Sequence, residues 1–278
     1  MSYYRLPVLK PPVWTWEVPA YFFVGGAAGA AAVIGAVGRA TGAPADLVRD
    51  ARWIAAAGGV LAPPLLISDL GRPERFLNML RVFKLQSPMS VGAWTLVAFS
   101  NAAAASAFAD AVGRSNGGRI AARVVADAAG VLAAATGMVL STYTGVLLGA
   151  TAIPAWSRHV RVLPMHFGAS SVGAAASLLE LAGHRSRSLN YLAIGAAAVE
   201  FAVGLSLERD PAGVPERPDR LAQAGAMMSG PVPLAIRLIG GRSLRARRVA
   251  ALATLTGSIL TRVGWVEAGR ASALASRP

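Results

Sequence analysis

Long uncharged stretches recur along this chain and constrain its fold more than any other feature. The clearest cover residues 18–38, 85–109 and 128–157, and none of them contains an Asp, Glu, Lys or Arg. A helix needs roughly 20 apolar residues to cross a hydrocarbon core of about 30 Å, because it must satisfy its backbone hydrogen bonds internally. Since the stretches reach that length, we expect an integral membrane protein.

The composition supports the same conclusion. Hydrophobic residues make up 54% of the chain and charged residues only 15%, which is less charge than soluble domains carry. The 30 glycines and the alanine-rich runs favour closely packed transmembrane helices, in which small side chains let the backbones approach. No segment marks a second domain, so residues 1–278 are expected to form one all-α, polytopic bundle.

Hydropathy and charge predict about eight spans, with both termini on one side of the membrane. The expected ranges are 18–38, 53–68, 89–111, 124–148, 162–183, 189–207, 221–240 and 249–266. The seventh is the weak one, because Pro231, Pro233 and Arg237 interrupt it and predict a broken, tilted or interfacial segment. A polar, proline-rich loop, ERDPAGVPERPDR at 208–220, precedes it.

Basic residues exceed acidic residues by 27 to 14, which gives a formal net charge of +13. Most of them lie between the predicted spans and are spread over both ends of the bundle, so the usual bias of Lys and Arg does not decide the orientation. The expected partners of this charge are anionic membrane lipids and a docked protein, and no nucleic acid partner is expected.

The chain contains no cysteine, so it has no disulfide and no iron–sulfur cluster of its own. Its three histidines are His159, His166 and His184. His159 is predicted to lie in a loop, and about 27 Å of helix separates the other two, so a haem with two histidine ligands is not expected. No motif for catalysis or metal binding stands out, and the chain is expected to perform no reaction alone.

The segment 68–94, SDLGRPERFLNMLRVFKLQSPMSVGAW, resembles the NrfD/PsrC family. The resemblance rests on DLGRPERF at 69–76 and SPMSVGAW at 87–94, and YTGVLLGATAIPAW at 143–156 and SILTRVGWVEAGRASA at 258–273 are also similar. Members of this family are polysulfide reductase-type membrane subunits that anchor molybdopterin and iron–sulfur oxidoreductases.

The resemblance implies a multi-pass subunit of the cell (inner, or cytoplasmic) membrane that reacts with a quinone, either menaquinone or ubiquinone. It also implies two partner proteins. One is a ferredoxin-like iron–sulfur subunit that exchanges electrons with the quinone through this chain, and the other is a catalytic subunit of the molybdopterin type or a related one.

A quinone site needs a hydrogen-bond donor or acid at each carbonyl, an apolar pocket and a route for protons. Glu17 and Tyr21 share one face where the first span begins, Tyr143 lies near the end of the fourth span, and both ends are expected beside Asp69. The resemblance implies that Tyr143 is the family's quinone-site tyrosine. His166, just inside the fifth span, is a further candidate donor or proton relay. The alternative is that these side chains only anchor the helices at the membrane interface.

Five charged residues follow the second span and are expected to contact the partner protein: Arg72, Glu74, Arg75, Arg81 and Lys84. Asp69 is expected to pair with Arg72. The alternative is a solvated loop beside the lipid, with ion pairs that are only structural.

Carboxylates inside spans are costly and are therefore functional candidates, so Glu180 and Glu200 are a possible proton path. The alternative is ion pairing with Arg185, Arg187 or Arg209. Arg262, near the last span, is expected to form a structural pair or to help docking. Two other functions stay open for the whole chain: a redox-coupled, proton-translocating subunit, and a passive anchor without a working quinone site.

Overall fold

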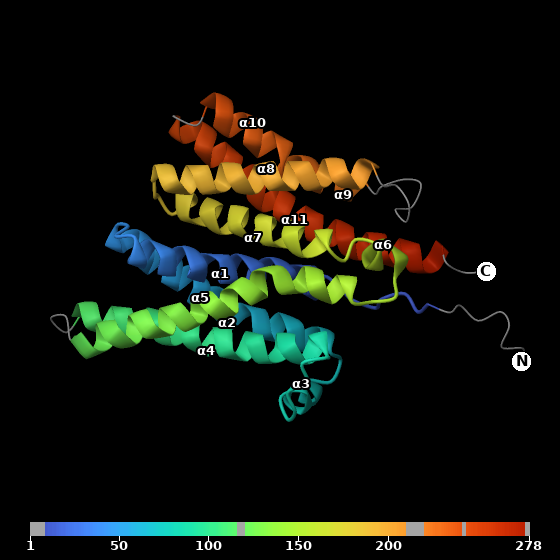
Figure 1. The fold of residues 1–278 in the computed structure, drawn as a ribbon, viewed down its shortest axis with the longest axis horizontal. Helices are drawn as coiled ribbons and strands as arrows, with labels where there is room; N and C mark the ends of the chain where they lie inside the picture. Colours follow the sequence, from blue (N-terminus) through green and yellow to red (C-terminus); the bar gives the residue numbers. More distant parts are fainter. Residues whose placement is uncertain (1–8, 116–119, 210–219, 241–242, 276–278) are drawn as a thin grey trace, which may run out of the picture.

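The computed structural model describes residues 9–115, 120–209, 220–240 and 243–275, and it confirms an all-α, multi-pass membrane protein (Figure 1). Within the described residues, seven helices are long and apolar enough to cross a membrane: α1 (Glu17–Ala40), α2 (Ala45–Asp69), α4 (Pro88–Ser115), α5 (Ile120–Gly149), α7 (Val162–Leu181), α8 (Arg187–Arg209) and α11 (Leu244–Ala275). Four shorter helices join them: α3 (Glu74–Met79), α6 (Pro154–Ser157), α9 (Arg220–Ser229) and α10 (Pro231–Gly240). Most of the proline-rich loop, residues 210–219, lies outside the described residues.

The predicted seventh span consists of α9 and α10, two helices of ten residues each that meet at Gly230. Pro231 has no N–H group and cannot continue the hydrogen-bond ladder of α9. Each helix alone is too short to cross a membrane. Together they run from the end of the bundle where α8 finishes to the end where α11 begins, so the seventh crossing is broken at its middle (Figure 1).

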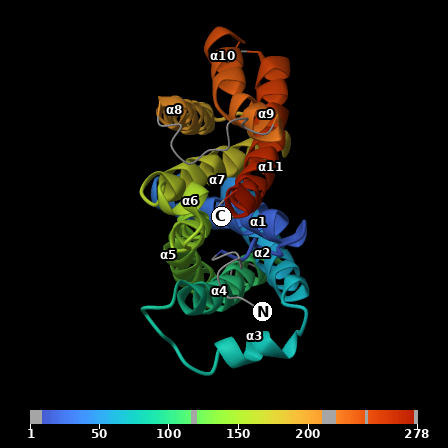
Figure 2. The same ribbon diagram turned by 90° about the vertical axis from the view of Figure 1, so that its right-hand side faces the viewer.

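The crossing helices form two groups, which meet where α1 and α5 pack against α7. The first group contains α1, α2, α4 and α5, and the second contains α7, α8, α11 and the α9–α10 pair. Besides its neighbours in the first group, α1 contacts α7 and α11. Figure 2 shows the helices end-on. Helices α2, α4 and α5 lie on one side of α1 and α7, helices α8, α9 and α10 lie on the other side, and α3 projects from the first group.

Helices α1 and α5 cross in direct backbone contact. Gly29 faces Gly137, and a methyl group on either one would overlap the backbone of the other. Such glycine contacts are typical of transmembrane interfaces, where close packing replaces the hydrophobic driving force. Because α1 and α5 run in opposite directions, Tyr21, eight residues before Gly29, and Tyr143, six residues after Gly137, lie towards the same end of the bundle.

We call this end the DLGRP end, because α2 ends there at Asp69 and α4 begins there at Pro88. At the opposite end α1 finishes at Ala40 and α2 begins at Ala45. The start of α1 and the last residues of α11 also lie at the DLGRP end (Figure 1).

Candidate functional site

Two carboxylates meet at the DLGRP end through Thr15, which precedes α1. The Thr15 hydroxyl donates to Oε2 of Glu17, and the Thr15 backbone N–H donates to Oδ1 of Asp69 at 3.3 Å. The hydroxyl oxygen also lies 3.4 Å from the same Asp69 oxygen. Since both carboxylates are partly exposed, they can exchange protons with water at this end. Thr15 is not among the residues predicted from the sequence, where its only signal is its place in TWEV, just before the first span.

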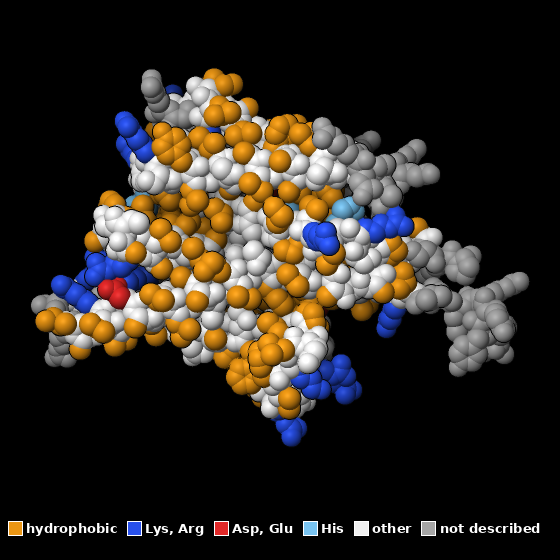
Figure 3. All heavy atoms as spheres, viewed as in Figure 1, with side chains coloured by type: hydrophobic (Ala, Val, Ile, Leu, Met, Phe, Trp, Pro, Cys, Tyr) orange, Lys and Arg blue, Asp and Glu red, His pale blue; other side chains and the backbone are white. Residues whose placement is uncertain are grey.

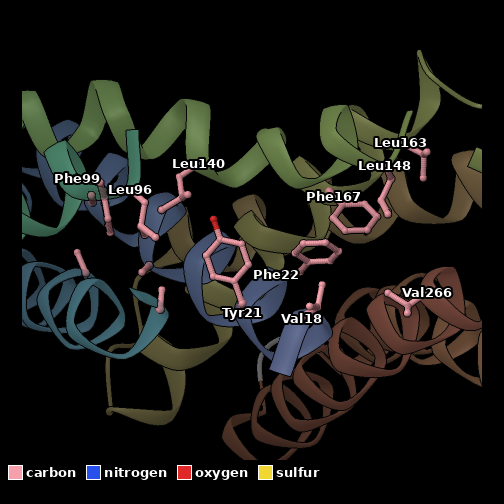
Figure 4. Close-up of a cluster of buried hydrophobic side chains, with 14 of the residues drawn as sticks. Val18, Tyr21, Phe22, Leu96, Phe99, Leu140, Leu148, Leu163, Phe167 and Val266 are labelled. Atoms are coloured by element: carbon pink, nitrogen blue, oxygen red, sulfur yellow. The ribbon is translucent and has the colours of Figure 1, made fainter. Parts of the chain in front are cut away.

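Tyr21 lies one helical turn below this pair and is buried, with 2% of its surface exposed. Its ring contacts Phe22, whose ring in turn contacts Phe167 of α7. Figure 4 shows the three rings in a row between α1, α5 and α7, with the Tyr21 hydroxyl pointing towards α5. The groups predicted for the first helix therefore combine a carboxylate at the surface with a phenol inside the apolar core.

Tyr143 of α5 packs against the start of α4. Its hydroxyl donates a hydrogen bond to the carbonyl of Pro88. Its ring lies directly on Gly92, where a methyl group would overlap it. Two residues of the SPMSVGAW segment thus form the seat of Tyr143, which is a structural reason for a glycine at this position.

A third residue of the same segment holds the preceding loop. The Ser90 hydroxyl donates to the carbonyl of Val82 at 3.2 Å and accepts from the backbone N–H of Lys84 at 3.1 Å. Ser90 is buried, so these bonds are protected from water. They fix the loop that bears the predicted docking residues.

All five predicted docking residues are exposed: Arg72, Glu74, Arg75, Arg81 and Lys84. They lie on or beside α3, which projects sideways from α4, and basic side chains gather on this projection (Figure 3). The projection also exposes large apolar side chains, among them Leu77, Phe83 and Leu85. The expected ion pair between Asp69 and Arg72 is wrong for the described residues, because Asp69 instead faces Thr15.

His166 is buried near the start of α7, on the α11 side of the aromatic row. Its ring contacts Phe167 and Trp265, and Trp265 also contacts the buried ring of His159. Nδ1 of His166 and Nε2 of His159 have no hydrogen-bond partner among the described residues. The structure thus places His166 with α11, whereas Tyr143 packs on α4.

The two other stretches quoted from the sequence pack against each other at the DLGRP end. The indole N–H of Trp156 donates to the carbonyl of Trp265 at 2.8 Å, and the Trp156 ring covers Gly269. The backbone N–H of Ala155 donates to Ser272 at 3.2 Å. The last turns of α11 are thereby fixed to α6.

Glu180, at the opposite end of α7, is buried between two arginines. Its Oε2 lies 2.8 Å from Nη2 of Arg237 in α10, and its Oε1 accepts from Nε of Arg247 in α11 at 2.9 Å. Arg237 is itself 2% exposed and also donates to Asn190 at 3.0 Å. Glu180 therefore forms ion pairs, which was the alternative to a proton path, but its partners are these two arginines and not the side chains of Arg185 or Arg187.

Arg262 lies in the middle of the bundle and not at its edge. It is 1% exposed, near the centre of α11, which at 32 residues is longer than the predicted span 249–266. Nη1 donates to the hydroxyls of Ser170 at 2.8 Å and Ser258 at 2.6 Å, and Nη2 donates to Ser171 at 3.1 Å. No carboxylate within the described residues lies within 4.0 Å of it, so the expected ion pair is replaced by serine hydroxyls.

Glu200 of α8 is the nearest candidate for a counter-charge. It is 3% exposed, and its Oε2 has no hydrogen-bond partner among the described residues. It lies within electrostatic range of both Arg262 and His166. A buried carboxylate, a buried guanidinium and a buried imidazole therefore share the second group of helices.

Comparison with known proteins identifies the family of this fold and site. Residues 8–191, more than half of the chain, match the family model described as polysulphide reductase, NrfD. The match includes α1 to α7 and both motif segments around Asp69 and Pro88, whereas the similar stretch at 258–273 lies beyond it. No curated protein matches the chain significantly. The chain belongs to the NrfD family, and it is a multi-pass membrane subunit of a redox complex.

Proposed function

We propose that this chain exchanges electrons between a membrane quinone, menaquinone or ubiquinone, and an iron–sulfur partner subunit of its complex. The observation that supports this most is the grouping of polar residues at the DLGRP end. Glu17 and Asp69 meet at Thr15 near the surface, and the phenols of Tyr21 and Tyr143 lie deeper at the same end. The projecting basic loop begins directly after Asp69.

The residues present fit a quinone in their chemistry. Val18, Tyr21, Leu96 and Leu140 belong to one buried apolar cluster, which suits a quinone ring. A bound quinone supplies the redox step, because it takes up or releases electrons together with protons. Tyr143 would hold one carbonyl by giving up its bond to Pro88, and the Glu17–Thr15–Asp69 group would pass protons between the site and water.

The basic loop supports the second half of the proposal. Its exposed arginines and lysine present positive charge beside the DLGRP end, and Ser90 holds their backbone in place. A partner with an acidic face would be attracted and oriented by such a surface. In this proposal the ferredoxin-like subunit docks on the basic loop and connects this chain to a molybdopterin-type catalytic subunit. The complex lies in the cell membrane.

The test is quinone reduction or quinol oxidation by the purified complex carrying Tyr143→Phe, Asp69→Asn or Thr15→Val. We expect turnover to fall about tenfold or more, in line with the loss of an acid–base group, while the subunits still purify together. Tyr191→Phe is the matched control, because Tyr191 is 68% exposed on α8. If the three variants keep full activity, the quinone site is not here and the passive-anchor function is favoured.

A second function, redox-coupled proton translocation, is favoured by the buried charges of the other helix group. Glu200 and Arg262 are buried, and Oε2 of Glu200 and Nε of Arg262 have no hydrogen-bond partner in the part of the chain that the structure describes. A charged group inside the membrane costs free energy, so its presence there indicates a functional role. Proton uptake by the complex in vesicles distinguishes the two functions. If protons move through the chain, Glu200→Gln would abolish proton uptake without stopping electron transfer. If they do not, the variant would leave proton uptake and electron transfer unchanged.

A further inference from the structure

A cavity of about 240 Å³ opens at the opposite end of the bundle, away from the proposed quinone site. Its described charged lining residues are four arginines and two aspartates, from α1, α2, α4 and α5: Arg39, Arg52, Arg114, Arg123, Asp110 and Asp127. Four positive and two negative charges leave a net charge of +2 around the cavity. Figure 3 shows acidic atoms surrounded by basic side chains at this end.

Both aspartates are already saturated by arginines. Arg52, 8% exposed, donates to Asp110 at 2.9 Å and to Asp127 at 2.6 Å. Asp127 also accepts three hydrogen bonds from Arg39, and Asp110 accepts one from Arg114 at 2.9 Å. The excess positive charge therefore favours an anion from outside the chain, and the cavity has the volume of several water molecules, enough for a phosphate group.

A separate apolar groove lies between two of these helices, α2 and α4, and is nearer to the middle of the membrane. The groove and the cavity share none of their described lining residues, but they adjoin along both helices. It has a volume of about 360 Å³ and is lined by hydrophobic side chains only: Trp53, Ala56, Ala57, Val60 and Leu61 of α2, and Ala104 and Phe108 of α4. Trp53 directly follows Arg52, and Phe108 lies two residues before Asp110. From Trp53 to Leu61 the groove extends about 12 Å along α2, which suits part of an acyl chain.

We propose that this end of the bundle binds an anionic phospholipid, with its phosphate in the arginine cavity and one acyl chain in the groove between α2 and α4. A positive pocket between transmembrane helices at the level of the head groups is the kind of site that binds such lipids. The groove distinguishes a lipid from free phosphate, because only a lipid fills both parts. The site is separate from the DLGRP end and does not depend on the proposed quinone chemistry.

The test measures binding and thermal stabilisation of the purified protein in non-ionic detergent. Phosphatidylglycerol, phosphatidylcholine with the same acyl chains, and inorganic phosphate are titrated separately. We expect phosphatidylglycerol to bind more tightly than either of the others. The double variant Arg39→Gln/Arg123→Gln removes two exposed arginines of the cavity and should weaken the binding of phosphatidylglycerol about fivefold for each arginine. Arg158→Gln/Arg161→Gln, at the DLGRP end, is the matched control and should have little effect.

A second pair of variants tests the groove. Ala57→Leu fills the groove and should weaken the binding of phosphatidylglycerol but not that of phosphate. Ala135→Leu, at an exposed position on α5, should change the binding of neither. The proposal is overturned if both lipids bind alike to all variants. It is also overturned if phosphate binds as tightly as phosphatidylglycerol and Ala57→Leu has no effect, because the cavity is then only an anion site.

Discussion

The hydroxyl of Tyr143 donates a hydrogen bond to the backbone carbonyl of Pro88, the first residue of α4. This bond joins α5 to the helix whose first turn also holds the basic loop through Ser90. Residues of one short segment, SPMSVGAW, thus hold both Tyr143, which is proposed to bind the quinone, and the proposed docking surface. A quinone that displaced Pro88 from Tyr143 would act directly on the segment that supports the docking loop.

Gly92→Ala is expected to destabilise the protein, because the added methyl group would overlap the Tyr143 ring. Overpacking of this kind costs about 1–3 kcal/mol. In a Tyr143→Ala background the ring is absent, so the same substitution should cost little. Thermal unfolding of the four proteins in detergent measures the coupling, which should exceed about 1 kcal/mol. Equal costs in both backgrounds would contradict the contact.

Glu180→Gln should be strongly destabilising, because it leaves Arg237 and Arg247 without their shared carboxylate in a buried site. Breaking one member of a buried ion pair typically costs about 3–5 kcal/mol. Glu267→Gln is the matched control, since Glu267 forms an ion pair with Arg270 that is partly exposed. Exposed pairs contribute about 0–1 kcal/mol. Comparable losses in the two variants would show that Arg237 and Arg247 do not depend on Glu180.

The sequence predicted the parts of the fold that have local causes. Apolar length determined the positions of the helices. Pro231, Pro233 and Arg237 predicted a broken, tilted or interfacial seventh segment, and α9 and α10 form the broken one. The DLGRP and SPMSVGAW segments identified the family, which the match over residues 8–191 confirms.

The contacts between distant helices could not be predicted in the same way. Arg237 marked a weak span in the sequence, but it is buried because Glu180, 57 residues away, lies beside it. Arg262 was expected to form a structural pair or to help docking, whereas its partners are the serines of α7 and α11 around it. Thr15 gave no signal beyond its place before the first span, since its contact with Asp69 depends on the end of another helix.

Ser90→Ala should loosen the docking loop without unfolding the bundle, because it removes the bonds to Val82 and Lys84. Each hydrogen bond contributes about 1 kcal/mol, so the loss of both should let the loop open about thirtyfold more often. Limited proteolysis within residues 70–87 should accelerate, and less partner subunit should purify with the chain. Ser100→Ala is the control on the same helix, because the Ser100 hydroxyl donates to the carbonyl of Gly59 in α2, at 2.7 Å, and not to the loop. If both variants behave alike, Ser90 does not hold the loop.

Arg262 provides the sharpest test of the buried charges. Its guanidinium binds Ser170 and Ser258 with one nitrogen and Ser171 with the other, and it lies 5.3 Å from the centre of the Phe167 ring. A lysine ammonium is a compact charge that cannot reproduce this two-armed geometry. Methionine has no charge to desolvate, and the three serines can bond to backbone carbonyls and to each other, as Ser171 already does with Phe167 and Ser170 with Ser258.

We therefore expect the free energy of unfolding of Arg262→Met to lie within about 1 kcal/mol of that of the parent protein, because no carboxylate within 4.0 Å among the described residues would lose its ion-pair partner. Arg262→Lys should be clearly less stable, because it leaves a buried charge with fewer hydrogen bonds. Thermal unfolding in detergent measures both. If Arg262→Met is the less stable variant, the charge itself holds the helices together. If Arg262→Met is stable but electron transfer or proton uptake is lost, the arginine is present for function, and its serine cage is what allows a charge to remain in the middle of the membrane.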